Sequence, residues 1–140
     1  MAVKQLSVFI QNHKGEMAGA VKKIADAGIN IKAMSVAEAG DFGILRLITT
    51  NSEAAADVLK EDSLVKLTDV VAVKMEDIEG ALYKVLDVLN KAEINVDYAY
   101  SFTANQNPAP YAVFRVDNVA EAEKVLVEGG CTLLEDKDLI

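Results

Sequence analysis

Residues 15–31 read GEMAGAVKKIADAGINI, and residues 80–96 read GALYKVLDVLNKAEINV. When the two stretches are aligned by a shift of 65 positions, Gly15 matches Gly80, Ala27 matches Ala92, and Ile29-Asn30 matches Ile94-Asn95. Apolar residues recur in both at i, i+3, i+4 and i+7, the spacing of one face of an amphipathic helix. They are Met17, Ala20, Val21 and Ile24 in the first stretch and Leu82, Val85, Leu86 and Leu89 in the second. The sequence therefore predicts an internal duplication with one helix at the same place in each copy.

The segments around these helices extend the duplication. Runs of alternating or β-branched residues predict strands on both sides of each helix, at 5–11, 29–37 and 42–49 in the first copy and at 70–76, 94–103 and 111–116 in the second. A second helix follows in each copy, at 51–61 and 119–128, and then a last strand, from residue 65 and at 131–135. This order predicts the α+β fold class, with two ferredoxin-like βαββαβ units, each an antiparallel sheet with its helices on one face.

We expect two domains, residues 1–68 and 69–140, with no flexible linker between them. A unit of this size buries only ~60% of its chain surface, so neither copy is expected to be very stable alone. Leu64–Met75 is strand-like sequence interrupted at Thr68-Asp69, where the chain is expected to bend or to cross between the copies. The segment Asn105–Pro110 contains both prolines and is expected to replace the short hairpin turn of the first copy.

Composition excludes several classes of function. The formal net charge is −8 and the pI is near 4.6, which argues against a nucleic-acid partner. No apolar run is long enough to span a bilayer, and Met1–Gln5 lacks the apolar core of a signal peptide, so we expect no membrane association and no export. Cys131 is the only cysteine, which is typical of a reducing, cytoplasmic location.

The residues of a familiar catalytic site are missing. His13 is the only histidine and lies far from Cys131 in sequence, so a zinc site of the usual spacing cannot form. There is no Walker A motif and no G-x-G-x-x-G. Adjacent acidic residues such as Glu76-Asp77 and Glu135-Asp136 are expected to be solvated surface. We therefore predict no catalytic residue, no metal, no cofactor and no enzyme activity.

The turn between the first strand and first helix of each copy is the candidate binding site. In the first copy it comprises Asn12, His13, Lys14, Gly15, Glu16 and Met17, and in the second it contains Asp77 and Gly80. A glycine lets a ligand approach the backbone, and the N–H groups of the helix N-terminus attract a carboxylate. Asn30 and Asn95 follow the helices, and their amides suit a ligand with both an ammonium and a carboxylate. Alternatively, these residues only cap the turns and hold the loops, and the residues alone favour that structural interpretation.

The chain resembles tandem ACT-domain proteins. The resemblance lies in Ala27-Gly28-Ile29-Asn30-Ile31, in its second-copy equivalent at 92–96, and in Asp41–Arg46. It implies a non-catalytic regulatory protein that binds an amino acid between two ACT-like copies. Lys14 and Glu79 replace the proline usual before the turn glycine, Asp77 replaces an asparagine, and Ile10 stands where some serine-binding relatives have histidine. The first copy is therefore the better candidate site.

Partners are suggested by the resemblance and by one aromatic strand. The family implies a homodimer and a regulated protein partner. Tyr98, Tyr100 and Phe102 lie on one face of a strand, where they form either a platform for RNA bases or a packing surface against another copy or chain. The acidic charge favours packing. The alternative to an amino-acid sensor is a structural or protein-interaction module without a ligand.

Overall fold

A computed structural model describes residues 2–103 and 110–139 of the chain. The chain divides into two compact units, Lys4–Thr68 (the N-terminal unit) and a C-terminal unit that begins at Asp69 and includes Val3. Apart from Pro110, which begins a strand, the predicted proline-containing loop lies outside the described residues.

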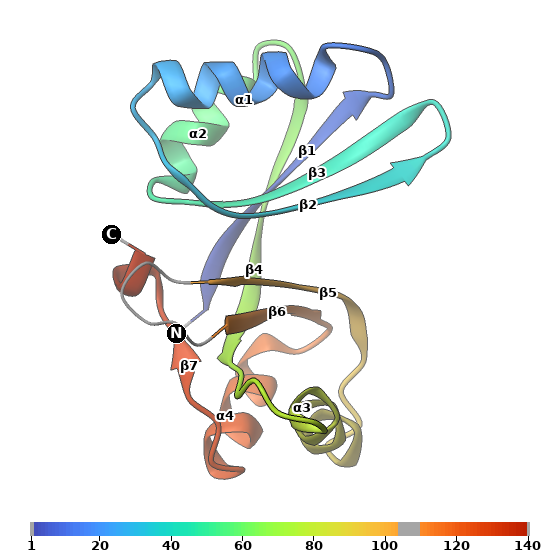
Figure 1. Cartoon of the computed structure of the whole chain (residues 1–140), viewed down its shortest axis with the longest axis vertical. Helices are drawn as coiled ribbons and strands as arrows, with labels where there is room; N and C mark the ends of the chain where they lie inside the picture. Colours follow the sequence, from blue (N-terminus) through green and yellow to red (C-terminus); the bar gives the residue numbers. More distant parts are fainter. Residues whose placement is uncertain (1, 104–109, 140) are drawn as a thin grey trace. The chain divides into compact units, whose positions relative to one another are not determined.

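The N-terminal unit has the predicted order of elements. They are β1 (Val3–Gln11), α1 (Glu16–Asp26), β2 (Ile31–Ala39), β3 (Phe42–Thr49), α2 (Ser52–Leu59) and the first part of β4 (Leu64–Lys74). Strand β3 pairs antiparallel with both β2 and β1, and β1 has β4 as its other neighbour. Helices α1 and α2 cover one face of this sheet (Figure 1).

The C-terminal unit repeats this order. After the second part of β4 come α3 (Ala81–Lys91), β5 (Val96–Thr103), β6 (Pro110–Val116), α4 (Val119–Glu128) and β7 (Leu133–Leu134), followed by a 3₁₀ turn, η1 (Asp136–Leu139). The strand order is β5-β6-β4-β7, with antiparallel pairing throughout. The prediction of two ferredoxin-like βαββαβ units is confirmed.

The junction between the copies lies within one strand. Of the two expected alternatives, a bend or a crossing at Thr68-Asp69, the chain crosses from one copy to the other while β4 runs without interruption from Leu64 to Lys74. Threonine is a strand-forming residue, and Val70–Val73 after the Asp are all buried in the sheet, so one acidic residue does not end the strand. The last strand of the first copy and the first strand of the second are therefore one element.

The cores are formed by the faces that the periodicity predicted. In the N-terminal unit, Ile24 of α1 and Leu59 of α2 pack against strand residues that include Leu6 and Leu45. In the C-terminal unit, the equivalent cluster contains Leu89 of α3, Leu126 of α4 and the fully buried Phe114 of β6. No helix within the described residues is both long and apolar enough to cross a membrane.

The first apolar position of each predicted stripe is an exception. Met17 is 38% exposed and Leu82 is 49% exposed, although both continue the buried face of their helices. Each lies in the first turn of its helix, next to the turn that follows the first strand. The candidate turns are therefore bordered by apolar surface that the cores do not cover.

Candidate functional site

The turn from β1 into α1 leaves the start of the helix without a side-chain cap. Gly15 occupies the N-cap position with φ +87°, in the left-handed region, and Gly80 does the same before α3 with φ +82°. Glycine is required there by this backbone conformation. A Cβ atom at either position would meet nothing within 4 Å, so space beside both turns is open.

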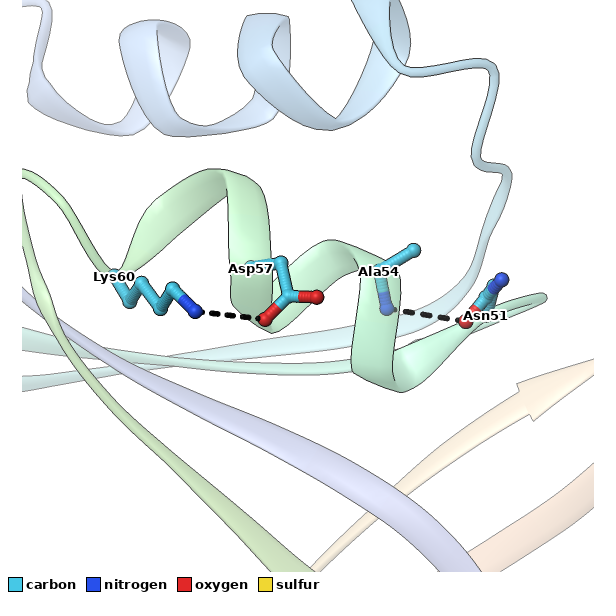
Figure 2. Close-up of polar contacts among 4 residues, drawn as sticks. All are labelled: Asn51, Ala54, Asp57 and Lys60. Atoms are coloured by element: carbon cyan, nitrogen blue, oxygen red, sulfur yellow. Dashed lines mark hydrogen bonds and ion pairs between the residues drawn. The ribbon is translucent and has the colours of Figure 1, made fainter.

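The other two helices begin differently. The side-chain oxygen of Asn51 accepts a hydrogen bond from Ala54 N at the start of α2 (Figure 2), and Asn118 accepts one from Glu121 N at the start of α4. These caps use the N–H groups that a bound anion would otherwise reach. Only the glycine-led helices α1 and α3 therefore lack such a cap.

Asn12 connects the turn to the β2–β3 hairpin. Its backbone N–H donates to Asp41 O at 2.8 Å, and its side-chain Nδ2 donates to Gly40 O at 3.1 Å. Because Gly43 pairs with Ile10, the hairpin lies directly beside the end of β1. Asn12 therefore holds together the two segments that border the site.

A small hollow lies between this turn and the hairpin, with a volume of about 230 Å³. Its polar lining comes from Gln11, Asn12, His13 and Glu38. Its apolar lining comes from Ile10, Met17, Val36, Ala37 and Gly43. The hollow is thus lined both by amide, imidazole and carboxylate groups and by aliphatic side chains.

Three of the predicted turn residues lie near the hollow without lining it. Lys14 and Gly15 belong to the same turn, while Glu16 lines a neighbouring, more open hollow of about 640 Å³ that also contains Phe9 and Phe42. His13 and Lys14 have no side-chain partner within the described residues. The structure therefore brings Asn12, His13, Lys14, Gly15, Glu16 and Met17 together at one end of the N-terminal unit.

Asn30 lies at the other end of the same unit from the turn, so the two do not meet within one copy. Helix α1 has 11 residues and carries the chain about 16 Å away from the turn before Asn30 is reached. Asn30 exchanges hydrogen bonds with Thr50, its N–H donating to Thr50 Oγ1 at 3.1 Å. Its side-chain amide has no partner within the described residues.

The equivalent turn of the C-terminal unit is more acidic. Asp77 lines an almost open depression of about 550 Å³ with Ile78 and Glu79. With Glu76, three exposed carboxylates precede Gly80, at the positions that Gln11, Asn12 and Lys14 occupy in the first copy. A carboxylate ligand is repelled by such a cluster. The N-terminal unit is the better site for an anion on electrostatic grounds.

Asn95 also differs from Asn30. Its side-chain Nδ2 donates to Asp97 Oδ1 at 2.8 Å, and its N–H donates to Asp117 Oδ1 at 3.2 Å. The amide that is free in the first copy is therefore already bonded in the second. Asn95 holds the start of β5 to the end of β6, as the structural interpretation of these asparagines requires.

The sequence did not indicate the hairpin residues that line the hollow, Val36, Ala37, Glu38 and Gly43. Their position depends on the register of β3 against β1, which a local pattern does not contain. The sequence does contain a signal for the hollow in Met17, which is the first apolar position of the helical stripe and lies in its lining.

Within residues 2–103 and 110–139, no group of three His, Cys, Asp or Glu side chains is arranged to hold a metal ion.

The aromatic strand is packed within its own unit. Tyr98 and Tyr100 stack with ring centroids 6.4 Å apart, and Phe102 stacks on Tyr111 at 5.6 Å. Phe102 is buried, with 8% of its surface exposed. The rings thus contact one another along β5 and β6.

Comparisons with known proteins identify the family that shares this fold. A family model described as an ACT domain pair matches residues 1–140. A protein from Bacteroides thetaiotaomicron of known crystal structure is 36% identical, with a TM-score of 0.91, 99% of this chain covered and 96% of that one.

More distant structures share the fold. The ligand-free regulatory subunit of aspartate kinase from Thermus thermophilus has 10% identity and a TM-score of 0.67, with 92% of this chain and 93% of that one covered. The corresponding subunit from Thermus flavus has 11% identity and a TM-score of 0.63, with 93% and 94% covered. No curated protein sequence matches the chain. The duplicated fold and the match over the full length lead to one conclusion: the chain belongs to the ACT domain pair family.

Proposed function

We propose that the protein is a non-catalytic regulatory sensor that binds a free amino acid at the β1–α1 turn of its N-terminal unit. The observation that carries the proposal is the uncapped start of α1 beside a small hollow with a polar and apolar lining. The ligand carboxylate would accept hydrogen bonds from the first N–H groups of α1, with Lys14 adding favourable charge. Its ammonium would donate to Glu38 and to the Asn12 side-chain oxygen.

Asn30 can take part only from another copy, and β2 offers the route. Strand β2 is at the edge of its sheet and has β3 as its only neighbour in the strand order. Its two charged residues, Lys32 and Glu38, lie symmetrically about Ser35. Antiparallel pairing with β2 of a second chain, centred on Ser35, would place Met34 opposite Val36 and bring Lys32, which lies in a β-bulge, near Glu38.

This pairing would complete the site. In the same register Asn30 of the second chain would face Gly40, whose carbonyl binds the Asn12 side chain. A carboxylate has two oxygens, so Glu38 can accept from both Lys32 of the second chain and the ligand ammonium. A homodimer would therefore have two equivalent sites, each with the turn of one chain and the asparagine of the other.

A thermal-shift screen against the twenty amino acids tests the proposal. A ligand at a hundredfold excess over its Kd stabilises the native state by about 2.7 kcal/mol. Lys14→Glu places a carboxylate where the second turn has Glu79, and it should reduce the shift. Lys124→Glu makes the same charge change on α4 and should leave the shift unchanged. If no amino acid stabilises the protein, the alternative of a structural or protein-interaction module is favoured.

A further inference from the structure

We infer that the turn between β4 and α3 is a docking surface for a basic, apolar segment of a partner protein. This surface, the acidic turn, comprises Glu76–Tyr83 of the C-terminal unit. It belongs to a different unit from the proposed amino-acid site, and its use does not require that any amino acid binds. Two independent features of the molecule support it: exposed apolar side chains at the turn and the distribution of charge along the chain.

The C-terminal unit exposes its large apolar side chains mainly at this turn. Four are exposed within the described residues of the unit, and three of them are Ile78 at 65%, Leu82 at 49% and Tyr83 at 70%. Ala81 N donates to Ile78 O at 3.3 Å, which holds Ile78 to the first turn of α3, where Leu82 and Tyr83 lie. Exposed apolar residues that are scattered singly are ordinary, whereas several in one turn indicate a contact surface.

The first copy shows that the turn does not need these side chains to form. Glu16 N donates to His13 O at 3.3 Å, just as Ala81 N donates to Ile78 O, and a glycine with positive φ precedes the helix in both copies. Ile78 stands where the first copy has histidine, and Tyr83 stands where it has alanine. The apolar side chains of the acidic turn are therefore available to a partner.

The net charge of the chain lies entirely in the C-terminal unit. Residues 4–68 contain eight acidic and eight basic residues, whereas residues 69–140 contain fourteen acidic and six basic residues. The net charge of −8 therefore belongs to the unit that carries the acidic turn. Glu76, Asp77 and Glu79 are exposed beside the apolar side chains, and none of them has an ion-pair partner in the part of the chain that the structure describes.

This charge determines what can cover the apolar side chains. The same unit of a second copy would bring two negative surfaces together, which is unfavourable. Nucleic acids and anionic membrane surfaces are repelled for the same reason. The N-terminal unit of a second copy is neutral, and its residues Lys22, Lys23 and Lys60 already pair with acidic neighbours. The occupant that matches the surface is a positively charged segment of another protein.

The pattern of the surface predicts the pattern of the partner. Ile78, Leu82 and Tyr83 would contact apolar side chains of the partner, and lysine or arginine residues beside these would face the carboxylates. Three side chains form a small contact, so we expect weak and reversible binding that becomes weaker as salt is added. A contact that is readily made and broken suits the output of a regulatory protein.

Fluorescence anisotropy with three synthetic helical peptides and the full chain tests the inference. The first peptide has leucine on one face and lysine on the other. The second has glutamate in place of each lysine, and the third has serine in place of each leucine. Only the first peptide should bind with a Kd in the millimolar range or tighter, because only this peptide has both the apolar side chains and the positive charge.

Variants of the protein locate the binding surface. Tyr83→Ser should weaken binding of the leucine–lysine peptide about fivefold or more. Val127→Ser is the matched control, because Val127 is the fourth exposed apolar side chain of the unit, at 59%, and is followed by Gly129, which lies beside the last turn of α3. Glu79→Lys should weaken binding about threefold. Glu128→Lys makes the same charge change at the end of α4 and should have little effect.

Several results would overturn the inference. Binding of the serine or glutamate peptide as tight as that of the first would show that charge alone or apolar contact alone is sufficient. Equal losses for Tyr83→Ser and Val127→Ser would show that the acidic turn is not the binding surface, and so would the absence of binding. A dimer in sedimentation that Tyr83→Ser dissociates would show that a second copy occupies the turn. The proposed sensor function would stand in each case, because the thermal-shift screen tests the turn of the other unit.

Discussion

Glu93 is the residue whose replacement by glycine should stabilise the protein. It has φ +59° and is the only residue other than glycine with positive φ in the described chain. Gly28 occupies the same place after α1 with φ +73°. The two helix ends have matching hydrogen bonds: Ile29 N donates to Ile24 O at 3.2 Å, and Ile94 N donates to Leu89 O at 3.0 Å.

The expected change in the free energy of unfolding is the difference between two opposing effects. The left-handed conformation costs a residue with a Cβ atom about 1–2 kcal/mol. Glycine loses more backbone entropy on folding, which costs about 0.5–1 kcal/mol. Glu93→Gly should therefore raise the free energy of unfolding by about 0.5–1 kcal/mol. For a chain of this length, that corresponds to a rise in Tm of about 2–4 °C.

Urea denaturation followed by circular dichroism measures the effect. Glu93→Ala is the control, because it removes the carboxylate from the end of the helix and keeps the Cβ atom. Gly28→Ala is the converse change and should lower stability by about 1 kcal/mol. If Glu93→Gly is no more stable than Glu93→Ala, backbone strain at this position is not what limits stability, and the reasoning is refuted.

Three further predictions concern stability and reactivity. Asn51→Ala and Asn118→Ala should each lower the free energy of unfolding by about 1 kcal/mol, because each removes a helix N-cap. Replacement of either asparagine by glycine should lower it by only a few tenths of a kcal/mol. Equal losses for alanine and glycine would contradict the capping role. Because β4 carries residues of both units in one uninterrupted strand, calorimetry should show a single unfolding transition, and two separate transitions would be evidence against this coupling. Burial raises the pKa of the Cys131 thiol while the nearby Lys84 lowers it, so alkylation by iodoacetamide should have a pH midpoint above that of an ordinary cysteine. Lys84→Met should move that midpoint higher still, and an unchanged or lower midpoint would show that the lysine does not act on the thiol.

The fold was predictable because its signals are local and occur twice. The helical stripe that begins at Met17 has its equivalent at Leu82, and the glycine turns mark where each helix starts. The uninterrupted course of β4 was not predictable in the same way. Thr68-Asp69 resembles a strand end when read alone, and only the pairing of the neighbouring residues in a sheet keeps the strand intact.

The site was predictable in part for the same reason. The turn at Asn12–Gly15 was evident from its glycine and from the helix that follows. The contribution of Val36 and Glu38 required the pairing of β3 with β1, which joins residues distant in sequence. The length of α1 separates Asn30 from the turn of its own copy, and this separation follows from the helix rise.

The most direct test of the account is where an amino acid binds. A titration of the ¹⁵N-labelled protein with pooled amino acids, followed by backbone amide chemical shifts, reports on each turn separately. If an amino acid binds at the β1–α1 turn, the amides of Glu16 and Met17 shift together with those of Val36–Glu38, and the amides of Ala81 and Leu82 do not. Shifts at the second turn alone, or no shifts at any amino-acid concentration up to the millimolar range, would contradict an amino-acid sensor with its site at the β1–α1 turn.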